Sequence, residues 1–132
     1  MNLLTVLLIT VRLSFQYDAP AGKSVGDYGC TVSNCVAVDL VVSKVIGTVT
    51  VKPLPGSRVE LLATLLCQAP TASWTSSNPR LSLWSGELFA GTIPLQIDLP
   101  NVSLEACWIE YKTLNTGLKP GGWEVQLTFY GE

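Results

Sequence analysis

Residues 9–17, Ile-Thr-Val-Arg-Leu-Ser-Phe-Gln-Tyr, alternate without a break between apolar and polar side chains. Successive side chains of a β-strand point to opposite faces of the sheet, so this alternation gives the stretch one apolar and one polar face. It predicts a strand that buries one side. The same period of two returns in residues 36–43, 58–68, 92–99 and 123–130.

Turn-forming residues separate these segments, most clearly at Pro53-Leu54-Pro55-Gly56 and Pro120-Gly121-Gly122. Between the strands no segment offers the helical crossover of a parallel α/β fold, which excludes that class. Residues 58–68 also have good helix propensity, but their alternation favours a strand. The sequence therefore predicts an all-β fold, a single-domain antiparallel β-sandwich or small barrel of about seven to eight strands over residues 1–132.

Glycine and proline positions refine this prediction. Gly47 predicts a bulge or bend, and Ser85-Gly86 predicts the turn of a short hairpin. Pro94 lacks a backbone N–H, which indicates that its strand lies at the edge of a sheet. Residues 18–34 hold one proline and several glycines, and they are predicted to form a long connection.

The composition indicates a surface that contacts other subunits. Charged residues make up 14% of the 132 residues and apolar residues 48%, whereas an average globular protein has ~25% charged residues. This balance excludes disorder and indicates an unusually large apolar or subunit-facing surface. The 8 Lys and Arg residues against 10 Asp and Glu residues give a net charge of −2. Because there is no basic run, we expect no nucleic acid among the partners.

Several observations argue against an enzyme. The chain has no histidine, which removes the commonest general base and metal ligand and every Ser-His or Cys-His arrangement. Glu105 and Glu110 fall on opposite faces of one predicted strand, so they cannot act as a catalytic pair. No glycine pattern of a phosphate-binding loop is present. We predict a non-enzymatic protein with no catalytic residues and no cofactors.

The N-terminal segment, residues 3–11, is apolar enough to resemble the core of a secretory signal. No Lys or Arg precedes it, Arg12 interrupts its far end, and it is shorter than the ~20 residues that a membrane span needs. We therefore interpret it as part of the folded protein. We expect a protein made in the cytoplasm, with no membrane partner.

The four cysteines are Cys30, Cys35, Cys67 and Cys107. Their spacing lacks the paired knuckles of a zinc site, so we predict no metal. As disulfides they allow three connectivities, of which a local Cys30–Cys35 link is the simplest. Because a cytoplasmic origin keeps thiols reduced, we predict reduced or late-oxidised cysteines and no disulfide that folding requires. Cys67 has the inward parity of its strand and is expected to fill the core.

Apolar and aromatic residues outside the expected core are the candidate interface. Trp108 and Trp123 lie on alternating strands and are predicted to be buried, whereas Trp74 and Trp84 lie in or beside polar loops. The run Leu3, Leu4, Val6, Leu7 and Leu8 is apolar on both faces, which is typical of a strand covered on both sides. We predict that residues 1–8 form an arm or strand between subunits. The interface candidates are Leu3, Leu4, Val6, Leu7, Leu8, Trp74 and Trp84.

These features favour a structural assembly subunit, because long strands with few charges aggregate unless another copy covers them. The first hypothesis is a bacteriophage virion protein, a capsid decoration (cement) protein or tail component, made in the host cytoplasm and bound to its own copies or to other virion proteins. An alternative is a fimbrial or pilus-type subunit at the cell surface. Residues 121–129 resemble the last strand of chaperone–usher pilins, which pair by strand donation. A small carbohydrate- or ligand-binding β-sandwich is the third hypothesis.

Overall fold

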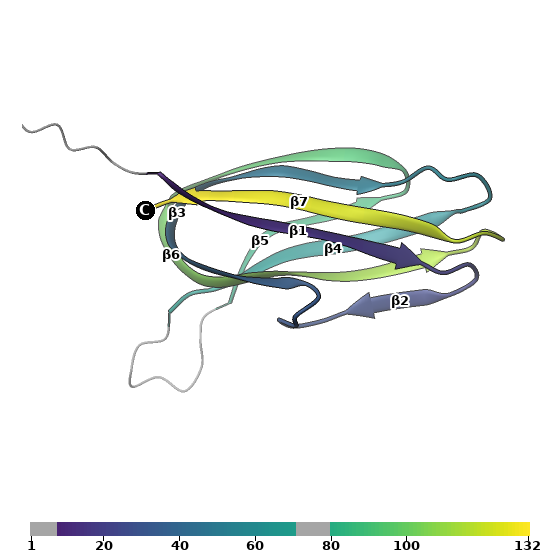
Figure 1. Cartoon of the computed structure of the whole chain (residues 1–132), viewed down its shortest axis with the longest axis horizontal. Helices are drawn as coiled ribbons and strands as arrows, with labels where there is room; N and C mark the ends of the chain where they lie inside the picture. Colours follow the sequence, from purple (N-terminus) through teal and green to yellow (C-terminus); the bar gives the residue numbers. More distant parts are fainter. Residues whose placement is uncertain (1–7, 71–79) are drawn as a thin grey trace, which may run out of the picture.

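The computed structural model describes residues 8–70 and 80–132, and these form antiparallel strands (Figure 1). The strands are β1 (Ile9–Ala19), β2 (Ser24–Asp27), β3 (Cys35–Val51), β4 (Val59–Gln68), β5 (Arg80–Leu88), β6 (Gly91–Asn115) and β7 (Gly121–Gly131). The predicted all-β antiparallel fold is confirmed. Residues 59–68 form β4, so the competing helix at that position is wrong.

The strands follow one another through hydrogen bonds in the order β1-β7-β3-β6-β4-β5, and β2 pairs separately with β6. The sheet folds over on itself into two layers (Figure 1). The first part of β6 pairs only with β3, whereas residues 106–115 pair with β4 on their other side. Pro94 lies in the first part, where β6 has a free edge, as its missing N–H predicts.

Two irregular positions bend the long strands from one layer to the other. The pairing of β3 with β6 shifts between Ala37 and Leu40 and again between Val42 and Lys44. Asp39 in β3 and Asn101 in β6 have positive φ angles of 47° and 53°, which non-glycine residues adopt rarely. Bulges of this kind kink a strand and increase its twist. Both strands curve at the end of the molecule that carries the C-terminus (Figure 1).

Gly47 is not the predicted bulge. It pairs in regular register with Leu95 on one side and Leu127 on the other. A Cβ atom there would lie 1.9 Å from the carbonyl oxygen of Gln126. Glycine is required at this position because the backbone of β7 approaches too closely for any side chain.

The core lies between the two layers, and the alternating residues of the central strands fill it. Tyr17 of β1 and Trp123 of β7 lie in one layer and face Tyr111 of β6 in the other, with ring centroids 4.7 and 4.9 Å from that of Tyr111. The largest fully buried side chains are Trp108, Trp123, Phe129, Leu13, Leu61, Leu65, Leu104, Ile109, Leu127, Val42, Val45 and Val49. The predicted burial of both Trp108 and Trp123 is confirmed.

Two further local predictions are wrong. The hairpin predicted across Ser85-Gly86 does not exist, because β5 runs through both residues and pairs along its length with β4. The connection predicted over residues 18–34 contains β2, a short strand whose partners, residues 111–114, lie far along the chain. Nothing in the local sequence signals that pairing.

Candidate interaction surfaces

The structure describes two of the predicted interface residues. Leu3, Leu4, Val6, Leu7 and Trp74 lie outside the described residues. Leu8 is 66% exposed and immediately precedes β1. Residues 1–7 therefore join the described chain at an apolar residue that the fold leaves uncovered.

Trp84 lies within β5 and not beside a turn. It pairs with Leu65 of β4, is half-buried, and packs against the core. Its ring also covers Gly86, where a Cβ atom would lie 2.2 Å from the indole. Trp84 thus has a place inside its own domain, at the strand that ends the sheet.

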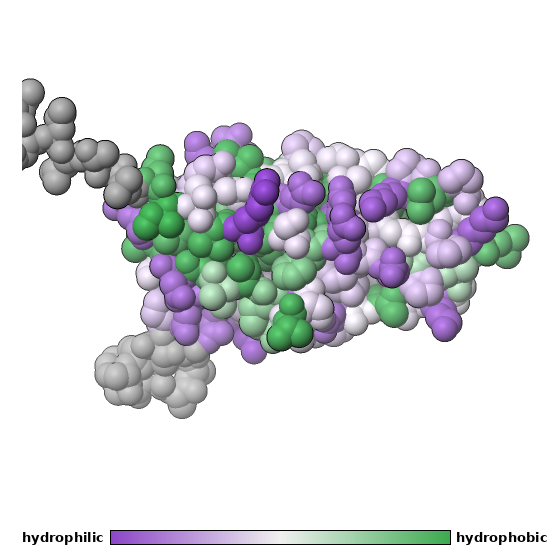
Figure 2. Space-filling view, in the orientation of Figure 1, coloured by the Kyte–Doolittle hydropathy of each residue, from purple (hydrophilic) through white to green (hydrophobic). Residues whose placement is uncertain are grey.

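Exposed apolar residues gather around Leu8. This end patch comprises Leu8 and Ile46, both of them exposed. A hollow of about 320 Å³ lies beside it, lined by Leu8, Ile46, Tyr130, Ser43 and Lys44. Figure 2 shows apolar colour concentrated at this end of the molecule. Contiguous apolar surface on a small protein marks a place where something else binds.

All four cysteines are paired, so the reduced alternative of the prediction is wrong, and late oxidation stays a prediction. Cys30 bonds to Cys35, which is the local link considered from the sequence, and Cys67 bonds to Cys107. Cys67 and Cys107 lie directly opposite each other in β4 and β6 and are fully buried, whereas Cys30 is exposed. The prediction that folding requires neither disulfide stays a prediction.

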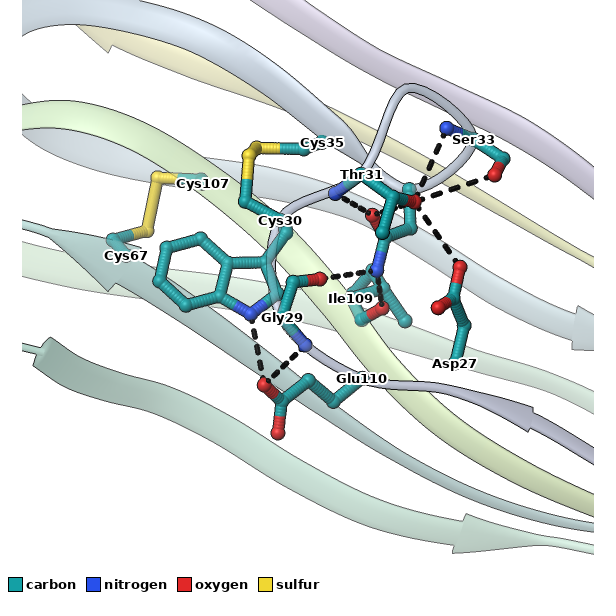
Figure 3. Close-up of a disulfide and its surroundings, with 12 residues drawn as sticks. Asp27, Gly29, Cys30, Thr31, Ser33, Cys35, Cys67, Cys107, Ile109 and Glu110 are labelled. Carbon is teal, nitrogen blue, oxygen red and sulfur yellow. Dashed lines mark hydrogen bonds between the residues drawn. A yellow bond between two sulfur atoms is a disulfide. The ribbon is translucent and has the colours of Figure 1, made fainter.

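The Cys30–Cys35 disulfide closes a loop, residues 28–34, that is fixed by a buried amide (Figure 3). Asn34 is fully buried. Its Nδ2 donates to the carbonyl oxygens of Gly29 and Ile109 at 2.8 and 2.9 Å. Its Oδ1 accepts from the backbone N–H and the hydroxyl of Thr31 at 2.7 and 2.8 Å. Because Ile109 belongs to β6, these bonds tie the disulfide loop to the sheet.

A carboxylate adds a second attachment of the disulfide loop to β6. One oxygen of Glu110 accepts hydrogen bonds from the backbone N–H of Gly29 at 2.9 Å and from the indole Nε1 of Trp108 at 3.0 Å. Arg80 lies over the Trp108 ring, 5.8 Å from its centroid. Trp108 is thus buried with its polar atom satisfied.

The disulfide loop exposes two large side chains that sequence analysis did not single out. Tyr28 is 68% exposed and Val32 is 99% exposed. A shallow hollow of about 430 Å³ lies beside Val32. It is lined by Val32 and by Cys30, Thr31, Cys35, Val36, Ala37 and Ala106. The local sequence signals this loop only through the pair Cys30 and Cys35. The exposure of Val32 depends on hydrogen bonds that hold the loop against β6, a strand far along the chain.

Tyr17 links β1 to the disulfide loop, since its hydroxyl donates to the carbonyl oxygen of Ser33 at 2.8 Å. Burial raises the pKa of Tyr17 well above its ordinary value of 10.0, and nearby Tyr111 and Asp27 raise it further. Burial and Asp27 also raise the pKa of Tyr111. Both side chains stay protonated at neutral pH.

No three His, Cys, Asp or Glu residues come together as a metal site within residues 8–70 and 80–132. In the same part of the chain, no helix has the length and apolar character to cross a membrane.

The comparisons with known proteins show remote structural likenesses. No protein-family model matches the chain, and no curated protein matches its sequence. The Yersinia pseudotuberculosis-derived mitogen is similar at 9% identity and a TM-score of 0.46, over 91% of this chain and 86% of that one. The Triatoma virus empty capsid matches at 9% identity and a TM-score of 0.45, over 94% and 87%.

A third likeness is to Bacillus endospore appendages, described as disulfide-linked pili. It has 10% identity and a TM-score of 0.38, and it covers 100% of both chains. At identities and TM-scores this low, a likeness says nothing about function. The function has to be inferred from the surface of the chain itself.

Proposed function

We propose that this protein is a non-enzymatic structural subunit that assembles with its own copies or with related shell proteins through apolar contacts. The particular form that we propose is a bacteriophage virion protein, either a capsid decoration protein or a tail component. The end patch supports the proposal most directly. Leu8 and Ile46 expose apolar surface beside a hollow, and the largely apolar residues 1–7 directly precede Leu8 in the chain.

The N-terminal segment supplies the rest of the proposed interface. Leu3, Leu4, Val6 and Leu7 precede Leu8 without a charged residue among them. Burial of one leucine contributes about 1.5–3 kcal/mol, so a few of these side chains suffice for stable association. We propose that a neighbouring subunit covers them and that Trp74 adds a further anchor, whereas Trp84 packs within its own domain.

The experiment is a measurement of mass in solution by sedimentation equilibrium over a wide concentration range. The full chain should form multimers, and deletion of residues 1–8 should abolish them while the far-UV circular dichroism of a β protein persists. Ile46→Glu should weaken association strongly, because it places a charge in the end patch.

The matched control is Leu54→Glu. Leu54 is also an exposed apolar residue, but it lies in the turn between β3 and β4, at the opposite end of the molecule (Figure 1). This variant should assemble like the unmodified chain. A full-length protein that stays monomeric at high concentration would contradict the proposal and favour a monomeric ligand-binding module.

The disulfides favour a second candidate, a fimbrial or pilus-type subunit assembled at the cell surface. Disulfides persist in oxidising compartments and are rare in the cytoplasm, and both cysteine pairs are bonded here. The two candidates differ in where the native protein is found. Thiol alkylation followed by mass spectrometry, on protein taken from purified virions and from the cell surface, would identify the location and the redox state together.

A further inference from the structure

Strand β1 forms one end of the sheet, and its outer edge has no partner strand within the described residues. It pairs with β7 alone, from Ile9 opposite Gly131 to Ala19 opposite Gly121, without a register shift (Figure 1). It contains no proline. A long, regular edge of this kind presents backbone N–H and C=O groups that a strand of another chain can bond.

The other free edges of the described sheet are obstructed. β6 carries Pro94 and Pro100 in the part that pairs only with β3. The pairing of β5 with β4 shifts between Leu65 and Leu66, β2 has only 4 residues, and the first part of β3 contains the irregular position at Asp39. Prolines, short strands and bulges keep sheet edges from pairing with other chains. β1 is therefore the edge through which a further strand can extend the sheet.

The inner face of β1 is also incompletely covered. Val11, Phe15 and Tyr17 point to the core but are only half-buried, whereas Val125 and Phe129 of the neighbouring β7 are fully buried. A strand added beside β1 would place its own inward side chains against this row. Such an addition would remove further apolar surface of β1 from water.

We propose that β1 pairs antiparallel with β1 of a second copy across a two-fold axis, so that the two domains share one continuous layer. Charge determines the register. Arg12 and Asp18 are the charged residues of β1, and both are exposed on its outer face. When Arg12 lies opposite Asp18 of the second copy, the two-fold axis repeats this pair at the other end of the contact.

Neighbouring registers lose this complementarity. A shift by one residue would place outward side chains opposite inward ones, and a shift by two would set Arg12 opposite Gln16 or Pro20 of the second copy. In the proposed register, Phe15 lies opposite Phe15 on the inner face. Cross-strand aromatic pairs and opposite charges both stabilise a sheet.

The backbone and the apolar row give this pairing its strength. Residues 11–19 of each copy would form the ladder, a longer run than the ~5–6 residues of an average strand. The two exposed ion pairs contribute less and fix the register. Because residues 1–8 lead directly into β1, the pairing also carries each arm onto the second copy and adds its apolar side chains to the same contact. This inference rests on the proposed function, since it names the strand through which the subunits meet.

Cysteine crosslinking tests the register. All four native cysteines are bonded, so an introduced cysteine is the one free thiol of the chain. Oxidation of a mixture of isotopically light Ser14→Cys and heavy Gln16→Cys protein should give a light–heavy disulfide, because these positions lie opposite each other. The matched control mixes light Ser14→Cys with heavy Thr10→Cys, which this register keeps ~20 Å apart. Equal yields from the two mixtures would overturn the proposal.

Charge reversal tests the energetics. Arg12→Asp alone brings two pairs of carboxylates together and should weaken self-association of the full chain about tenfold in sedimentation equilibrium at low salt. Asp18→Arg alone should weaken it similarly. The variant with both substitutions restores opposite charges and should associate like the unmodified chain. The matched control, Lys112→Asp, changes an exposed charge of β6 by the same amount and should leave association unchanged.

The outcomes separate this inference from the proposed function. Circular dichroism of each variant should match that of the unmodified chain, because every changed side chain is exposed. A full chain that stays monomeric would contradict both the proposed function and this inference. A chain that associates, but whose double variant associates no better than either single variant, would contradict this inference alone.

Discussion

Asn34 determines the conformation of the disulfide loop through a side chain that is out of reach of water. Replacing it with alanine leaves the carbonyl oxygens of Gly29 and Ile109 without the Nδ2 donor, and it leaves the N–H and the hydroxyl of Thr31 without the Oδ1 acceptor. Asn34→Ala should therefore lower the free energy of unfolding by about 1–3 kcal/mol, measured by urea denaturation. Ser33→Ala, at an exposed neighbour in the same loop, should change it by less than ~0.5 kcal/mol. Equal effects of the two substitutions would contradict the role assigned to Asn34.

Tyr17 should make the stability depend on alkaline pH. Its folded pKa is raised above the ordinary 10.0, so the folded state holds the proton more tightly than the unfolded state. The stabilisation is complete below pH ~10 and is lost as pH rises through the raised pKa. In Tyr17→Phe the free energy of unfolding should fall less steeply above pH ~10. At neutral pH it should be lower by about 0.5–1.5 kcal/mol, for the lost bond to Ser33.

Urea denaturation at a series of pH values measures both effects of the Tyr17→Phe substitution. A variant that loses stability above pH ~10 as steeply as the unmodified chain would show that Tyr17 does not carry the alkaline dependence. Tyr111 contributes in the same direction, because burial raises its pKa too. Some alkaline loss should therefore remain in the variant.

At the scale of elements, the two disulfides should differ in their effect on stability. Cys67–Cys107 joins β4 to β6 across a sequence separation of 40, whereas Cys30–Cys35 closes a separation of 5. Because a longer closed loop removes more entropy from the unfolded chain, loss of the first should cost about 4 kcal/mol and loss of the second about 2 kcal/mol.

The measurement is urea denaturation of the two double alanine variants. Both should still fold, because net stabilities of about 5–15 kcal/mol exceed either loss. A larger loss for the Cys30 and Cys35 pair would show that the disulfide loop stabilises the domain far beyond its entropy. Failure of either variant to fold would contradict the prediction that folding requires no disulfide.

Alternation predicted the strands that keep one face buried along their whole length, such as β1 and β7. For β3 and β6 the alternation predicted separate shorter segments, whereas each is one continuous strand. In β3 the buried residues change from even positions, ending at Val42, to odd positions, starting at Val45. A bulge and a break between strands produce the same change of parity, so the sequence cannot distinguish them. The corner that turns one sheet into two layers was therefore missed.

The candidate surfaces could be predicted only in part, for a related reason. Leu8 was identified from its apolar neighbours, which is a local property. Exposure of Val32 depends on Asn34 reaching Ile109, a contact across 75 positions of the chain. Trp84 looked like a loop residue because Ser85-Gly86 imitates a turn, but in β5 the missing side chain of Gly86 makes space for the indole.

At the scale of the whole molecule, the end patch and the disulfide loop are two separate apolar surfaces made by different residues. An arm that binds a different surface of its neighbour can continue from copy to copy. Such a contact through the end patch would by itself link copies into an extended array.

The salt dependence of assembly should show which force holds the subunits together. Raising the ionic strength from ~0.1 M to ~1 M shortens the Debye length from about 10 Å to about 3 Å and weakens contacts between exposed charges. Contacts through the end patch should persist, and sulfate should strengthen them because it favours apolar burial. Light scattering across a salt series measures the assembled mass. If sodium chloride dissolved the multimers, charges such as Lys44, beside the end patch, would have to carry the interface.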